Sequence, residues 1–126
     1  LEVRKSVTPV KTKGGEFALK VSLSLKARHE VENVTLTDKI PSIVKIYKKF
    51  GTLKPDRIDT ESRRIQWNIG DLEAEEERSF SYIVYSKVGI VGKFSLPRAL
   101  AVFEKEGRIH EIDSNNVFFM NEQANE

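Results

Sequence analysis

Residues 17–25, with the sequence FALKVSLSL, decide the fold class of this chain. Apolar residues occupy every second position of the segment, and the positions between them carry small or charged residues. Successive side chains of a β-strand point to opposite faces, whereas a helix would scatter these apolar residues around its circumference. The segment therefore predicts a strand with one buried face and one face toward solvent.

The same period of two recurs along most of the chain. It predicts further strands over residues 3–10, 34–37, 43–50, 65–69, 79–86, 94–104 and 109–120. Glycines predict breaks at 14–15, 51, 70–71, 89–92 and 107. The polar segments 26–32 and 72–78 are interpreted as loops, and the segment 54–63 as a loop or a wide hairpin.

About seven to eight short strands separated by turns are typical of an all-β protein. Because each strand has one apolar face, we predict an immunoglobulin-like sandwich of two mostly antiparallel sheets. The length of 126 residues suits one domain, which we assign to residues 1–120, followed by a disordered polar tail at 121–126. The predicted core contains Leu19, Val21, Leu23, Leu36, Ile65, Trp67, Ile69, Tyr82, Val84, Phe94 and Ala101.

Composition excludes several classes of protein. The 21 basic and 19 acidic residues nearly cancel, which argues against a nucleic-acid binder. The absence of cysteine excludes disulfides, cysteine zinc sites and thiol nucleophiles. No apolar run approaches the length of a membrane span, so we expect any anchor to lie in segments outside this sequence. The chain begins without methionine and reads as a piece of a larger protein, and its high charge favours a thermophilic source.

Two motifs resemble a known family. Residues 33–41, NVTLTDKIP, and residues 67–72, WNIGDL, resemble signatures of the DUF11-like repeat domains of archaeal and bacterial cell-surface and S-layer-associated proteins. Residues 111–116, EIDSNN, are similar to the related CARDB adhesion-type domains. Phe94 departs from the frequent tyrosine, and three glutamates at 75–77 replace a glycine-containing turn. The resemblance implies an extracellular stalk or adhesive module with the immunoglobulin-like fold and without catalytic residues.

The side chains that most often carry chemistry are sparse. His110, Glu111 and Asp113 form a candidate metal cluster, but neighbours on a strand point to opposite faces, so His110 and Glu111 do not easily share an ion. His29 lies in a polar loop. Asp113, Asn115 and Asn116 form a candidate calcium site, since oxygen ligands suit calcium, but they lack the spacing of an EF-hand. We expect the asparagines to cap a turn instead. We therefore predict no metal, no cofactor and no enzymatic activity.

A basic middle segment with interleaved aromatic residues is the candidate interaction surface. It is centred on Tyr47, Lys48, Lys49 and Phe50, and it extends to Lys45, Lys54, Arg57, Arg63 and Arg64. The alternative is a solvated strand edge protected by lysines. Ile90 and Val91 form a second candidate contact at an apolar loop tip. Expected partners are other proteins or neighbouring copies of this domain, whose acidic residues 71–77 would meet the basic segment head to tail.

Three functions stay open at this point. The leading hypothesis is a non-enzymatic structural or interaction module of a surface-exposed prokaryotic protein, in which Asn33 of the triplet Asn33-Val34-Thr35 is a candidate glycosylation site. The second is a polysaccharide-binding domain that uses Tyr47, Phe50 and Tyr85. The third is an accessory domain of a membrane-associated protein or enzyme.

Overall fold

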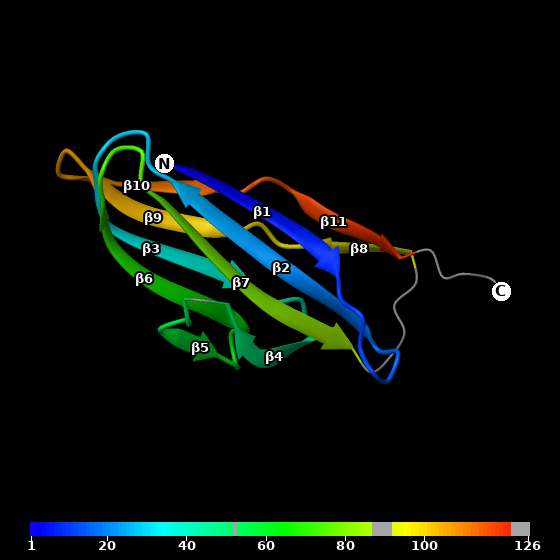
Figure 1. The fold of residues 1–126 in the computed structure, drawn as a ribbon. Coiled ribbons are helices and arrows are strands. Elements are labelled where there is room, and N and C mark those ends of the chain that lie inside the picture. Colours follow the sequence, from blue (N-terminus) through cyan, green and yellow to red (C-terminus); the bar gives the residue numbers. More distant parts are fainter. Residues whose placement is uncertain (52, 87–91, 122–126) are drawn as a thin grey trace.

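The computed structural model describes residues 1–51, 53–86 and 92–121, and all regular structure in these ranges is β-strand (Figure 1). The strands are β1 (Glu2–Pro9), β2 (Phe17–Lys26), β3 (Val31–Lys39), β4 (Lys45–Phe50), β5 (Arg57–Asp59), β6 (Arg64–Leu72), β7 (Glu77–Ser86), β8 (Gly92–Leu96), β9 (Leu100–Lys105), β10 (Arg108–Asp113) and β11 (Val117–Asn121). The described residues contain no apolar helix of membrane-spanning length.

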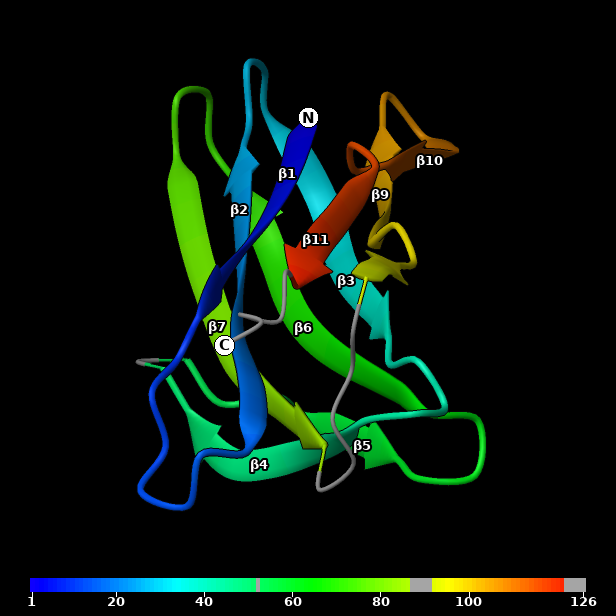
Figure 2. The ribbon, with the colours of Figure 1, turned by 90° about the vertical axis from the view of Figure 1, so that its right-hand side faces the viewer.

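Two antiparallel sheets face each other and form the predicted sandwich (Figures 1 and 2). One sheet has the strand order β1-β2-β7-β4, and the other has the order β10-β9-β3-β6-β5. A separate two-stranded ribbon of β8 and β11 continues the hairpin of β9 and β10, and β11 lies beside β1. The predicted all-β, immunoglobulin-like sandwich class is confirmed.

Strand β2 shows how the alternating sequence builds the core. Val21 lies opposite Val7 of β1 on one side and Tyr82 of β7 on the other. The inward positions Leu19 and Leu23 are fully buried, as is Val21. Every residue of the predicted core is buried except Ile69, which is partly buried and packs against the core. The period of two in the sequence therefore identified the buried faces correctly.

The described part of the chain has eleven strands in place of the predicted seven to eight, because long segments are interrupted. Residues 94–104 were expected to form one strand, but the chain breaks at Pro97, which has no N–H for a sheet ladder. The segment expected at 109–120 is likewise divided into β10 and β11 by residues 114–116. Of the two alternatives for residues 54–63, the structure has the hairpin, because this segment contains the short strand β5, which pairs with β6.

Two predicted boundaries were also wrong. Gly70 and Asp71 do not form a turn, because they lie inside β6, where Gly70 adopts a φ of 87° opposite a bulge in β3. Glycine accommodates this left-handed conformation without a side-chain clash. Strand β3 begins at Val31 inside a predicted loop. Asn121 belongs to β11, while the rest of the predicted tail and the predicted break at 89–91 lie outside the described residues.

Asn115 joins the hairpin break to the first strand. Its Oδ1 accepts a hydrogen bond from the Lys5 backbone N–H at 2.8 Å, and its Nδ2 donates to the Lys5 carbonyl at 3.0 Å. The side-chain amide thus replaces the backbone of a neighbouring strand at the free edge of β1. Beside it, the Ser114 hydroxyl accepts a hydrogen bond from the Ala99 N–H at 2.9 Å. The asparagine was expected to cap a turn, and it instead fixes the position of Lys5.

Candidate functional site

The outer surface of the four-stranded sheet carries a row of small hydroxyl side chains. Ser6, Ser22 and Ser81 lie opposite one another across β1, β2 and β7, and Ser24 and Ser79 form the next row. We call these five residues the serine face. Because their side chains are short, they leave an open hollow of about 720 Å³ on the sheet. The hollow offers hydroxyl groups that both donate and accept hydrogen bonds.

Cationic side chains border the serine face. Arg4 lies directly opposite Ser24, is exposed, and forms an ion pair with Glu2 at 2.7 Å. Lys20, also exposed, precedes Ser22 on the same face of β2 and lines the same hollow. The surroundings of the hydroxyl groups are therefore polar and carry positive charge.

Two tyrosines extend the same sheet surface beyond Lys20. Tyr47 of β4 is 48% exposed, and its ring meets the ring of Tyr85 of β7 edge to face, with 5.7 Å between centroids. Tyr85 follows Ser81 and Ile83 on one face of β7, which places Ser81 and Tyr85 about 13 Å apart at the usual rise of a strand. Hydroxyl groups, a lysine and an aromatic pair thus lie along one strip of the sheet, with the apolar Ile83 between the serines and the tyrosines.

Gly51 closes the hollow where β4 ends. Its N–H donates to the Ser81 carbonyl at 3.2 Å, and a Cβ atom at this position would clash with Ser81 Oγ. A side chain at position 51 would therefore displace the Ser81 hydroxyl and occupy part of the hollow. The close backbone approach accounts for glycine here.

The structure separates the residues of the predicted interaction surface. Tyr47 is on the exposed strip, but Phe50 is partly buried and packs against the core, because the pairing register of β4 with β7 shifts between these two residues. Lys48 and Lys49 belong to β4, and the structure does not describe their side chains. Ile90 and Val91 lie outside the described residues. Phe50 therefore packs against the core and does not join the Tyr47–Tyr85 pair.

The predicted basic segment is not a uniform cationic surface. The Arg63 guanidinium donates to the backbone carbonyls of Ile40, Pro41 and Val44, with the Pro41 bond at 2.7 Å, and so fixes the loop between β3 and β4. Arg57 and Arg64 flank Asp59 in a separate hollow on the other sheet. The acidic turn between β6 and β7 lies at the opposite end of the sandwich from the turn between β5 and β6 (Figure 2). Head-to-tail pairing of copies stays a prediction.

Asn33 and the histidines lie away from the serine face. Asn33 is exposed, has a φ of 50°, and its N–H donates to Asp71 Oδ1 at 3.0 Å. His110 stacks on Phe103 with 5.4 Å between ring centroids, and His29 is exposed between β2 and β3. Within the described ranges, no three His, Asp or Glu side chains are grouped to hold a metal ion.

Sequence reasoning missed a buried polar cluster between the sheets. Lys5 Nζ lies 2.7 Å from Asp38 Oδ1, and both side chains are completely buried. The Tyr82 hydroxyl donates to Asp38 Oδ2 at 2.5 Å, and the Lys39 N–H donates to Asp38 Oδ1 at 3.0 Å. The available signal was positional, because Lys5 stands between the inward residues Val3 and Val7, and Asp38 continues the inward series of β3.

Burial controls the titration of this cluster. It raises the pKa of the Asp38 carboxyl above its ordinary range, although the Lys5 charge and the Tyr82 hydrogen bond act in the opposite direction. Burial, and after it the nearby Asp38 charge, raise the pKa of the Tyr82 phenol well above its ordinary value near 10. The folded protein therefore holds both protons more tightly than the unfolded chain does.

The raised pKa of Tyr82 predicts a loss of stability in alkali. Above about pH 10 the unfolded chain releases the Tyr82 proton while the folded protein keeps it, so the free energy of unfolding falls by up to about 1.4 kcal/mol per pH unit from this group. Urea unfolding between pH 8 and 11 measures the slope. Tyr82→Phe is expected to have a shallower slope, and identical slopes for the two proteins would contradict the assignment.

Comparison with known proteins finds structures of similar fold but identifies no family. No protein-family model matches the chain, and no curated protein matches it. The chain is similar to part of the GH20 exo-β-N-acetylglucosaminidase of Vibrio harveyi in complex with N-acetylglucosamine, with a TM-score of 0.59 at 12% identity. An inactive mutant of that enzyme matches with a TM-score of 0.61 at 11% identity. Each match covers 99% of this chain and 19% of the other, so this chain spans about a fifth of the enzyme's length.

Proposed function

We propose that this chain is a non-catalytic interaction module of a larger surface-exposed protein, and that the serine face with Tyr47 and Tyr85 binds a saccharide chain. The observation that carries the proposal is the strip of hydroxyl, cationic and aromatic side chains on one sheet. The resemblance of residues 33–41 to cell-surface repeat domains supports the location.

The chemistry of the strip suits a saccharide. Serine hydroxyls donate and accept hydrogen bonds, as sugar hydroxyls do, and the short side chains leave room for a ring. A tyrosine ring offers an apolar face to the C–H groups of a sugar and a hydroxyl at its rim. The centre of a protein–protein interface is usually more apolar than the serine face. These features favour a polar, extended polymer over a folded protein partner.

Two further points define the first ligands to test. The similar Vibrio harveyi structure holds N-acetylglucosamine, which supports oligomers of that sugar as a first probe. Arg4 and Lys20 border the hollow and favour an acidic sugar, so a uronic acid polymer is the second probe. His110 is stacked on Phe103 and lies away from the strip, which supports binding without catalysis.

The expected result is measurable binding of one of these two probes and its loss in the variant Tyr47→Ala/Tyr85→Ala. Isothermal titration calorimetry with N-acetylglucosamine oligomers and with the uronic acid polymer measures affinity. Removal of two stacked aromatic contacts should weaken binding at least tenfold, because each contact of this kind contributes about 1 kcal/mol. Ser22→Gln/Ser81→Gln should weaken binding similarly by filling the hollow.

Phe118→Ala is the matched control. Phe118 is an aromatic residue of β11 with 57% exposure and lies outside the strip. Its removal should leave the affinity unchanged. Absence of binding to both probes, or equal binding by wild type and the double tyrosine variant, would overturn the proposal.

A further inference from the structure

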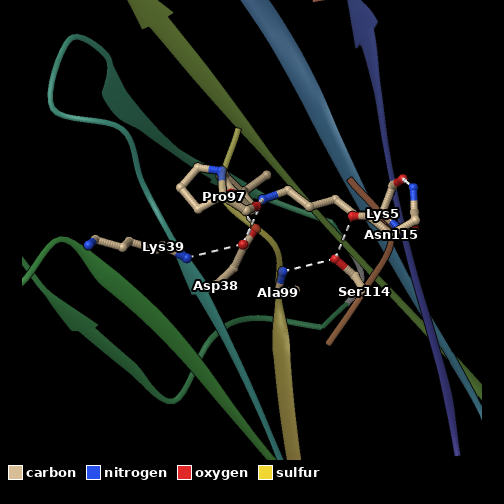
Figure 3. Close-up of polar contacts among 8 residues, drawn as sticks. Lys5, Asp38, Lys39, Pro97, Ala99, Ser114 and Asn115 are labelled. Carbon is tan, nitrogen blue, oxygen red and sulfur yellow. Dashed lines mark hydrogen bonds and ion pairs between the residues drawn. The ribbon is translucent and has the colours of Figure 1, made fainter. Parts of the chain in front are cut away.

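Lys5 and Asp38 face each other across the interior of the sandwich. Lys5 belongs to β1 of the four-stranded sheet, and Asp38 belongs to β3 of the five-stranded sheet (Figure 3). The amine nitrogen and Oδ1 are 2.7 Å apart, and neither side chain is exposed to solvent. An amine and a carboxyl group are therefore held in contact in a site from which water is excluded.

Neighbouring groups orient both partners. The two hydrogen bonds of Asn115 fix the backbone of Lys5, and Lys5 Nζ also donates to the Pro97 carbonyl at 2.6 Å. Asp38 receives the Tyr82 hydroxyl on Oδ2 and the Lys39 N–H on Oδ1. Each carboxyl oxygen thus has its own donor, and the amine is directed at one side of the carboxyl group.

Proton transfer within the pair gives its reactive form. Separated charges are costly away from water, and transfer of one proton from Lys5 to Asp38 along their hydrogen bond gives a neutral amine beside a neutral carboxylic acid. The raised pKa of the Asp38 carboxyl agrees with this direction of transfer. A neutral amine has the lone pair that attack on a carboxyl carbon requires, and a neutral acid accepts that attack more readily than a carboxylate.

We propose that Lys5 and Asp38 condense to an intramolecular amide that joins β1 to β3. Lys5 Nζ forms a bond to Asp38 Cγ, and the bond from Cγ to Oδ1 breaks. Oδ1 leaves as water with the hydrogen of the acid and one hydrogen of the amine, so no oxidant or other reactant is required. Oδ2 remains as the amide oxygen.

The donors around Asp38 lie where charge develops in this reaction. The Tyr82 hydroxyl contacts Oδ2, which carries negative charge in the tetrahedral intermediate, and the Lys39 N–H contacts the leaving oxygen. Tyr82 is therefore a positioning and stabilising residue for the bond. The product would fasten the two sheets together in a chain that has no cysteine.

Intact mass spectrometry of the unfolded full chain tests the proposal. The wild-type protein should be lighter than its sequence mass by one water molecule, and tryptic digestion should yield a branched peptide that joins the segments around Lys5 and Asp38. Lys5→Arg keeps the positive charge and should have its full sequence mass. Tyr82→Phe should show a larger uncondensed fraction, which declines slowly with time after purification.

Lys26→Arg is the matched control, because the Lys26 side chain on β2 is 44% exposed, and this variant should keep the mass deficit. A wild-type protein of full sequence mass after prolonged incubation would overturn the proposal. A deficit that persists in Lys5→Arg would place the dehydration at another residue and would overturn it equally. The wild-type measurement decides the question even where a variant fails to fold.

Discussion

Replacement of Asp38 by alanine is expected to lower the free energy of unfolding by at least about 3–5 kcal/mol, because it leaves the Lys5 amine buried without its partner. The Tyr82 hydroxyl also loses its acceptor in the core. Urea unfolding followed by the fluorescence of Trp67, the only tryptophan of the chain, measures the change. Much of the molecule's stability is then lost, since a domain of this size has about 5–15 kcal/mol in total.

Two variants separate the possible origins of this loss. Asp113→Ala removes an exposed carboxylate and should change the free energy of unfolding by less than about 0.5 kcal/mol. Lys5→Met/Asp38→Leu replaces both partners of the pair by apolar groups. If Asp38→Ala loses only an ion pair, this double variant should recover the lost stability. It does not restore stability where a covalent bond between the strands was lost. A loss below about 1 kcal/mol in Asp38→Ala would contradict the structure of the cluster.

Trp67→Ala is expected to cost about 3–5 kcal/mol, because it opens a large cavity at the centre of the core. Trp67 is 1% exposed and contacts the rings of Phe80 and Tyr82, at 5.2 and 6.3 Å between centroids. Its indole N–H donates to the Leu53 carbonyl at 3.3 Å, a bond that alanine cannot replace. Thermal unfolding followed by circular dichroism measures the loss, since the variant has no tryptophan.

Ile109→Ala is the control for apolar truncation. Ile109 is 71% exposed on the edge strand β10, so its removal should change stability by no more than about 0.5 kcal/mol. The stability loss of Trp67→Phe should lie between those of Trp67→Ala and Ile109→Ala, because phenylalanine keeps a ring in the core. Equal unfolding temperatures for Trp67→Ala and Ile109→Ala would refute the central position of the tryptophan.

The sequence predicted the buried faces because they depend only on local alternation. Residues 17–25 alternate, and in 79–86 Phe80, Tyr82 and Val84 recur at every second position; both segments form strands that bury these apolar positions in the core. Gly70 shows the limit of local reasoning. A glycine followed by aspartate is typical of a turn, but here long-range pairing of β6 with β3 carries the strand through it.

The candidate site was less predictable because its parts come from distant strands. The serines of β2 and β7 are visible as polar positions in alternating segments, but only the pairing of these strands places Ser22 beside Ser81. Lys5 and Asp38 likewise occupy inward-facing positions of two different strands, where apolar residues are usual. Nothing local in either strand identifies the other residue as its partner. Phe50 looked equivalent to Tyr47, and the register shift in β4 turned it toward the core.

The position of β11 beside β1 has a mechanical consequence. Strand β1 begins next to Leu1 and β11 ends at Asn121; these strand ends lie toward opposite sides of the sandwich, and both strands run along it (Figure 1). A tensile force on these two residues is therefore directed along the strands. The hydrogen bonds between β1 and β2 are perpendicular to that direction, so they bear the load in shear and together rather than opening one after another. Extension from these two ends is therefore expected to require the β1–β2 ladder to break as a unit.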